Sequence, residues 1–178
     1  MASTTYAPSA LYLKQARADL AACDVLLGTN DAAHRCHAVA KSQQAVEKAV
    51  KAVGVALIEA GVFGSLRGLL DHKPVRILKL LYQHDPGQGG LLASARASLG
   101  ELTYDGRVEA LCNLAPTTDT TRRNTEYPFQ KGACWQTPSD TGAFDATETN
   151  VWRELAREAI RRADIVLRDV AMVTPRRP

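Results

Sequence analysis

The sequence is poor in aromatic residues and has no long apolar run. Aromatic side chains make up 6% of its 178 residues, although 46% of the residues are hydrophobic. A membrane-spanning helix needs about 20 consecutive apolar residues, and no run in the chain approaches that length. The first ten residues, MASTTYAPSA, also lack the charged segment and apolar core of a secretory leader. We therefore expect a cytoplasmic chain with no membrane partner.

Closely spaced cysteine pairs are missing as well. The four cysteines include no C-x-x-C pair and fall mostly at apolar positions of helical patterns, which favours reduced, buried thiols over disulfides or a zinc site. They are Cys23, Cys36, Cys112 and Cys134. His34 and His37 flank Cys36 and share a helix face, but no further ligand cluster lies nearby. The sequence therefore predicts no metal site and no other cofactor.

The size and charge of the chain are those of an ordinary globular protein. A chain of 178 residues buries about two thirds of its unfolded surface, so we expect one domain over residues 1–178. The formal net charge of +3 is a weak indication of an anionic partner, because a nucleic-acid footprint requires basic residues clustered on one face.

The stretch 31–59 predicts the central helix of the fold. Its apolar side chains recur at helical spacing with one gap, Gln43, which we interpret as a buried polar group that fixes register or as a dimer contact. A second stripe of alanines permits close helix packing. Glu47 and Lys51 are spaced for an ion pair on a solvated polar edge that also includes Gln44 and Lys48.

Four other segments have helical periodicity. They are 10–27, a short helix beginning near Pro74, 91–114 with a weak point at Asp105-Gly106, and 147–172 with Thr147 as a candidate cap. Residues 115–146 are rich in Thr, Pro, Gly and Asp and have no sustained period, which predicts a long loop of functional importance. The predicted fold is an all-α, up-and-down bundle of four to five helices with its core at residues 11–172.

The segment 43–52, QQAVEKAVKA, resembles the second-helix signature of the HEPN family of small, helical nucleotide- and RNA-associated domains. Residues 11–27 resemble that family's first helix, and Glu126-Tyr127-Pro128 resembles its R-Y-P segment with Glu in place of Arg. The resemblance implies a HEPN-like bundle that forms homodimers. It also implies that the chain binds nucleotide or RNA, or a nucleotidyltransferase-type partner, in a toxin–antitoxin or defence system.

The resemblance also suggests which residues bind the ligand. Its nucleotide- or RNA-binding groove would lie along the polar edge of the central helix and under the long loop; the candidates are Lys48, Lys51, Arg122, Arg123 and Tyr127. Arg122 and Arg123 would supply the positive charge that Glu126 lacks. The alternative interpretation of the helix residues is a solvated, salt-bridged edge.

Two other functions remain open. HEPN ribonucleases carry Arg, four to six residues, then His, and Arg67 with His72 fits that spacing, so these two residues would be catalytic in a metal-independent ribonuclease toxin. Chance predicts about one such match, and the region before the last helix contains no histidine, which favours the binding module over the ribonuclease. The third candidate is a helical scaffold subunit without a ligand.

Overall fold

A computed structural model describes residues 7–65, 74–83, 90–140 and 142–173. It confirms the predicted all-α bundle. The elements, in chain order, are α1 (Ser9–Gly28), η1 (Ala32–His34), α2 (Arg35–Glu59), α3 (Pro74–Gln83), α4 (Gly90–Tyr104), α5 (Gly106–Cys112), β1 (Phe129–Lys131), β2 (Cys134–Gln136) and α6 (Ala146–Val173).

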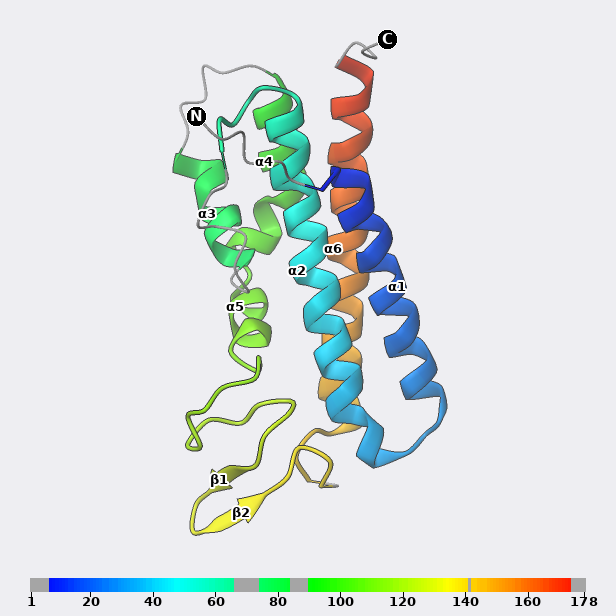
Figure 1. Cartoon of the computed structure of the whole chain (residues 1–178), viewed down its shortest axis with the longest axis vertical. Helices are drawn as coiled ribbons and strands as arrows, with labels where there is room; N and C mark the ends of the chain where they lie inside the picture. The colour runs from blue at the N-terminus through cyan, green and yellow to red at the C-terminus, as the bar shows by residue number, and fades with distance from the viewer. Residues whose placement is uncertain (1–6, 66–73, 84–89, 141, 174–178) are drawn as a thin grey trace.

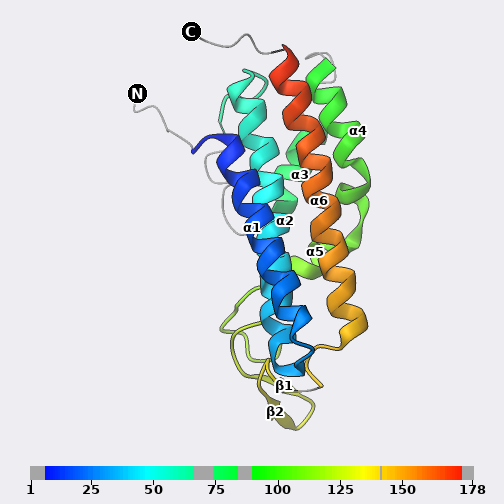
Figure 2. The same ribbon diagram turned by 90° about the vertical axis from the view of Figure 1, so that its right-hand side faces the viewer.

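The long helices alternate in direction along the bundle. In the orientation of Figure 1, α1 descends, α2 ascends beside it, α4 and α5 descend, and α6 ascends against α2. Helix α3 packs against α2 and α4, away from α1. The first turn of α1 and the last turn of α6 lie at one end of the molecule, and the hairpin β1–β2 lies at the other (Figure 2).

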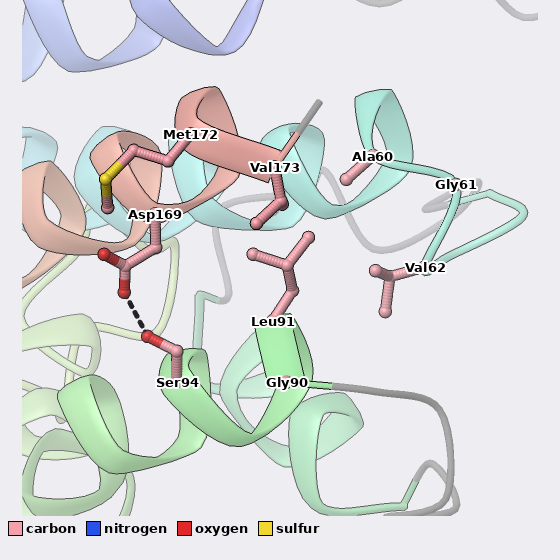
Figure 3. A pocket seen from close by; sticks show the side chains of 9 residues that line it. All are labelled: Ala60, Gly61, Val62, Gly90, Leu91, Ser94, Asp169, Met172 and Val173. Atoms are coloured by element: carbon pink, nitrogen blue, oxygen red, sulfur yellow. Dashed lines mark hydrogen bonds between the residues drawn. The ribbon is translucent and has the colours of Figure 1, made fainter. Parts of the chain in front are cut away.

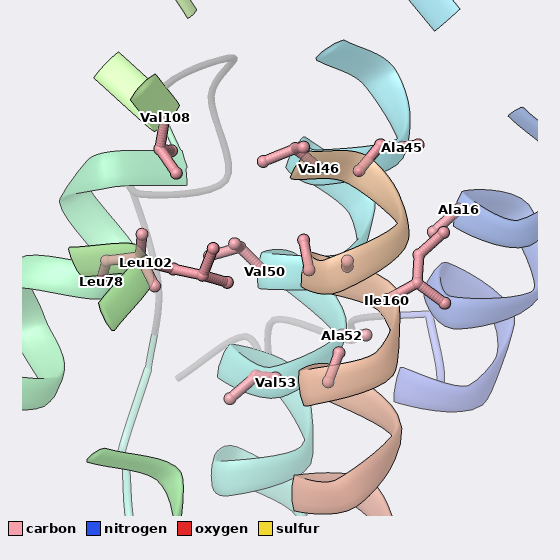
Figure 4. Close-up of a cluster of buried hydrophobic side chains, with 14 of the residues drawn as sticks. Ala16, Ala45, Val46, Val50, Ala52, Val53, Leu78, Leu102, Val108 and Ile160 are labelled. Carbon is pink, nitrogen blue, oxygen red and sulfur yellow. The ribbon is translucent and has the colours of Figure 1, made fainter. Parts of the chain in front are cut away.

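Helix α2 is the centre of the hydrophobic core. Figure 4 shows Val46, Val50 and Val53 directed toward Leu78 of α3 and Leu102 of α4, and all five side chains are buried. On the opposite side, α2 packs its alanines against neighbouring helices within the same chain; Ala38, Ala45, Ala49, Ala52 and Ala56 are fully buried. The alanine stripe therefore provides no exposed surface for the predicted homodimer, which stays a prediction.

Two helix boundaries differ from the sequence-based prediction. The helix expected over 91–114 is two helices, because Asp105 adopts an extended conformation and its carboxylate accepts a hydrogen bond from Arg107 N at 2.9 Å, which starts α5. The predicted cap Thr147 is wrong, since Asp145 Oδ1 accepts from Glu148 N at 2.7 Å. Asp31 caps the start of η1 by accepting a hydrogen bond from Ala33 N at 2.9 Å.

The segment predicted as a loop, 115–146, contains a small antiparallel hairpin. Phe129 pairs with Gln136, Gln130 with Trp135 and Lys131 with Cys134. Cys134 is exposed, so the prediction of buried thiols is wrong for this cysteine. Cys23 and Cys36 are buried, as predicted. Burial raises the pKa of the Cys112 thiol to about 12, and the nearby Glu47 carboxylate adds to this effect.

No helix in the described ranges is long and apolar enough to cross a membrane. No group of three or more His, Cys, Asp or Glu side chains in the same ranges is arranged to hold a metal ion.

Candidate functional site

The signature segment of α2 and the long loop meet at one cavity. Its volume is about 290 Å³, and the signature side of the cavity consists of Gln43, Gln44, Glu47 and Lys48 together with Ala40. The opposite wall consists of Ala115, Pro116, Thr125 and Glu126. We call this cavity the α2–loop pocket. Two of the three segments that carry the family resemblance are therefore adjacent in space, although about 80 residues separate them in the chain.

Lys48 reaches the α2–loop pocket from a charged cluster shared with α1. Its Nζ lies 3.0 Å from Asp19 Oδ2, and Lys41 Nζ lies 3.3 Å from Asp19 Oδ1. Lys41 also donates to Gln44 Oε1 at 2.9 Å, which orients the amide of that residue. Two ammonium groups thus share one buried carboxylate, and the carboxylate of Glu126 on the loop wall balances the second positive charge.

Lys51 lies about one turn further along α2, and its ammonium group forms an ion pair. Its Nζ lies 2.6 Å from Glu47 Oε1, and both residues are buried. The predicted ion pair is therefore confirmed, but the prediction of a solvated edge is wrong for these two residues. Glu47 lines the α2–loop pocket beside Lys48, and the ammonium group of Lys51 neutralises the Glu47 carboxylate.

The loop wall of the pocket is held by hydrogen bonds to the main chain. Thr125 N donates to Leu114 O at 3.2 Å, and Asn124 Oδ1 accepts from Glu126 N at 3.0 Å and from Tyr127 N at 2.7 Å. These contacts bury Thr125, which is 1% exposed. Among the described residues its Oγ1 has no hydrogen-bond partner and is itself shielded from solvent, so the loop wall contains a buried hydroxyl that is costly to leave unpaired.

Gln43 has a different environment from the one that the sequence suggested. It is 7% exposed, as expected for a buried polar group, but it lines the α2–loop pocket. The gap in the apolar pattern thus marks a residue of α2 that faces a cavity and not the hydrophobic core.

Arg122 and Arg123, which were predicted to close over α2, bind other parts of the chain. The guanidinium of Arg122 donates to Asn113 O and Oδ1 at 3.0 and 3.2 Å. Arg123 donates to Ala143 O at 2.9 Å, pairs with Glu148 at the start of α6, and lies over the Phe144 ring at 4.7 Å from its centroid. Both arginines therefore brace the loop where it joins the helices.

Tyr127 is 52% exposed and lines a separate surface groove with Trp135. Of the five predicted binding residues, Lys48 is the one that lines the α2–loop pocket. The candidate catalytic residues Arg67 and His72 lie outside the described residues, so their role in catalysis stays a hypothesis. The sequence-based prediction did not include Thr125 in the site, because a threonine inside a polar loop gives no signal of burial.

A larger cavity lies at the opposite end of the bundle. Its volume is about 700 Å³, and Figure 3 shows that Leu91, Val62 and Val173 approach it while the carboxylate of Asp169 accepts a hydrogen bond from Ser94 at its edge. The described lining residues include this acidic group and no basic one. The α2–loop pocket differs from this cavity in having a lysine, Lys48, among its lining residues.

Comparisons of the chain with protein-family models, with curated proteins and with solved structures found no match.

Proposed function

We propose that the chain is a HEPN-like binding module whose α2–loop pocket holds a nucleotide, either free or as an unpaired residue of an RNA. The observation that supports this function best is the meeting of the α2 signature with the loop that precedes Tyr127-Pro128. In the resemblance described above, these are the two segments associated with the ligand.

The polar groups of the pocket suit the two halves of a nucleotide. The amides of Gln43 and Gln44 and the carboxylate of Glu126 line the cavity, and such groups bind the donor and acceptor edges of bases. Lys48 and the adjacent Lys41 supply positive charge for a phosphate. A rotation of the Thr125 side chain would bring its hydroxyl, which can donate or accept, to the ligand.

The size of the pocket limits the ligand. A volume of about 290 Å³ lies just below the range for small-molecule sites, which begins near 300 Å³. The pocket therefore suits one nucleotide and excludes a duplex. Docking of a nucleotidyltransferase-type protein over the same loop is compatible with this proposal, because such a partner would present or consume the bound nucleotide.

The test is equilibrium binding of nucleotides and of single-stranded RNA to the wild type and to Lys48→Gln, Thr125→Val and Lys14→Gln. Lys14 is an exposed lysine of α1, so its variant has the same change in charge without altering the pocket. A charge-assisted hydrogen bond contributes about 1.5–3 kcal/mol, so we expect Lys48→Gln to weaken binding about tenfold or more and Lys14→Gln to leave it nearly unchanged. Thr125→Val should weaken binding by a smaller factor.

Equal binding by all four proteins, or none by the wild type, would overturn the proposal. A parallel assay of RNA cleavage in the presence of chelator, with an Arg67→Ala/His72→Ala variant, separates the ribonuclease alternative. Cleavage that survives the chelator and disappears in the double variant would make the chain an enzyme rather than a binding module.

A further inference from the structure

An aromatic groove, separate from the α2–loop pocket, lies on the outer surface of the long loop. Its volume is about 380 Å³, and its lining residues are Thr117, Thr118, Thr120, Tyr127, Pro128 and Trp135. Trp135 is 59% exposed and Tyr127 is 52% exposed. Burial of such large rings contributes strongly to association, and aromatic residues are enriched at protein interfaces.

The aromatic groove is held in place before any ligand binds. Phe129 is 2% exposed, and because side chains alternate along a strand, the pairing of Phe129 with Gln136 places the neighbouring Trp135 on the outer face of the hairpin. Gln130 N donates to Thr120 O at 2.7 Å, which ties the hairpin to the threonine wall. The amide of Tyr127 is fixed by the Asn124 side chain.

The chemistry of the aromatic groove favours a proline-rich, basic peptide. Grooves with Tyr and Trp walls bind proline-rich segments in the polyproline II conformation, and the Tyr127 hydroxyl and Trp135 indole N–H can donate to peptide carbonyls. Asp119 is exposed and lies between the lining residues Thr118 and Thr120 in the chain. Hydrogen bonds from Thr121 lower the pKa of Asp119, so this carboxylate stays charged, which attracts a basic peptide and repels a nucleic-acid backbone.

The chain itself contains such a peptide. Residues 174–178 read TPRRP, with Pro175 and Pro178 in P-x-x-P spacing and two arginines between them. We infer that the aromatic groove binds the segment 174–178 of a second copy of this chain. This inference is independent of the proposed nucleotide site.

The segment cannot reach the groove of its own molecule. It follows the last turn of α6, and the hairpin lies beyond the first turn of that helix (Figure 1). The 28 residues of α6 span about 42 Å, whereas five extended residues span roughly 17 Å at most. Binding must therefore join one end of a molecule to the opposite end of another, which is a head-to-tail contact.

The first test is calorimetric titration of the protein with the synthetic peptide VTPRRP, which corresponds to residues 173–178. We expect saturable binding that is at least about tenfold weaker for Trp135→Ala, because aromatic anchors dominate interfaces. Tyr104→Ala is the matched control, since Tyr104 is a 77% exposed aromatic residue at the end of α4. A peptide with both prolines replaced by alanine should bind at least about tenfold more weakly.

The second test is sedimentation velocity of the full chain over a range of concentrations. We expect self-association that is lost in Trp135→Ala and in Pro175→Ala/Pro178→Ala, and that added VTPRRP reverses. Three results would overturn the inference: no binding of the peptide, equal binding by Trp135→Ala and the wild type, or a wild type that stays monomeric at concentrations where the peptide saturates the groove. Displacement of the peptide by a neutral sugar or an oligonucleotide would assign the groove to that ligand instead.

Discussion

The helices α1, α2 and α6 and the loop region 113–145 are stabilised by different forces. In the helices, stability comes from apolar side chains, with α2 buried over most of its length between its neighbours. The loop region adds Leu114, Phe129, Ala143 and Phe144 to the same core, but it also depends on side chains bonded to the main chain. Asn124, Asp119 and Asp140 each accept hydrogen bonds from backbone amides near them in sequence.

This difference separates the scaffold of the molecule from its candidate binding surfaces. The loop wall of the α2–loop pocket and the whole aromatic groove belong to the loop region, whereas the helices supply the rigid wall that contains Lys48. Hydrophobic burial tolerates little change in volume, while hydrogen-bonded loops tolerate changes at the positions that face solvent. The expected effects of substitutions in the two regions differ accordingly.

The largest effect is expected for Leu57→Ala in α2. Leu57 is fully buried in the core, and removing such a side chain costs about 2–5 kcal/mol of unfolding free energy because a cavity remains. Leu11→Ala is the matched control, since Leu11 is 54% exposed and its truncation should change stability by roughly 0.5 kcal/mol or less. Chemical denaturation of both variants measures the difference. Equal costs would show that α2 is not the centre of the core.

An intermediate and local effect is expected for Asn124→Ala in the loop region. Asn124 is fully buried, and its loss leaves the amides of Glu126 and Tyr127 without their acceptor, at a cost of about 1–3 kcal/mol. Hydrogen exchange should accelerate at Tyr127 and at Gln130 while the α2 amides keep their protection.

The matched control for this change is Asn150→Ala. Asn150 is exposed, and its side-chain amide donates to Ala146 O within α6, so we expect no change in the exchange of loop amides. If the α2 amides exchanged faster together with those of the loop in Asn124→Ala, the two regions would unfold as one unit and the contrast between them would be lost.

The smallest effect is expected for the acid dependence of the ion pairs that Glu158 makes within α6. Hydrogen bonds from Arg161, and secondarily from Arg162, lower the pKa of Glu158 from 4.5 to about 2. Because the folded-state pKa lies below the unfolded one, this carboxylate stabilises the fold above pH 4.5, and that contribution disappears as the pH falls toward 2. Solvent screening limits it to about 1 kcal/mol or less.

Urea unfolding of the wild type and Glu158→Gln between neutral pH and pH 2.5 tests this effect. We expect the wild type to be more stable at neutral pH and the gap between the two proteins to close as the pH falls. A gap that stayed constant with pH would show that Glu158 contributes through packing and not through its charge.

The periodic helices could be predicted from the sequence because each has an apolar face of regular spacing. Asp105-Gly106 was also recognisable as a weak point, although only the structure shows that Asp105 starts a new helix there. The hairpin could not be predicted, since strands of three residues are too short to show an alternating pattern. The burial of Lys51 was hidden as well, because helical spacing does not show which neighbour covers a face.

The candidate site was predicted in part. Lys48 was identified through the signature segment, and Gln43 was recognisable as a gap in the apolar pattern. The roles of Thr125 and Glu126 depend on how the loop returns to α2, which is determined by contacts such as Thr125 N to Leu114 O. Such contacts produce no periodic pattern in a sequence. The charged residues Arg122 and Arg123 were therefore easier to select as candidates than Thr125 and Glu126.

The polar contacts between α1 and α2 have a consequence for how the chain avoids misfolding. An alanine-lined helix interface is smooth, and sliding one helix by a turn of about 5.4 Å would still bury similar side chains. Ser9 with Glu59, Asp19 with Lys48 and Cys23 with Ser42 meet at three successive heights along the two helices. A slip would separate the Ser9–Glu59 and Cys23–Ser42 pairs at once and would leave the Asp19 carboxylate beside one lysine instead of two, so only one alignment of the helices is competitive.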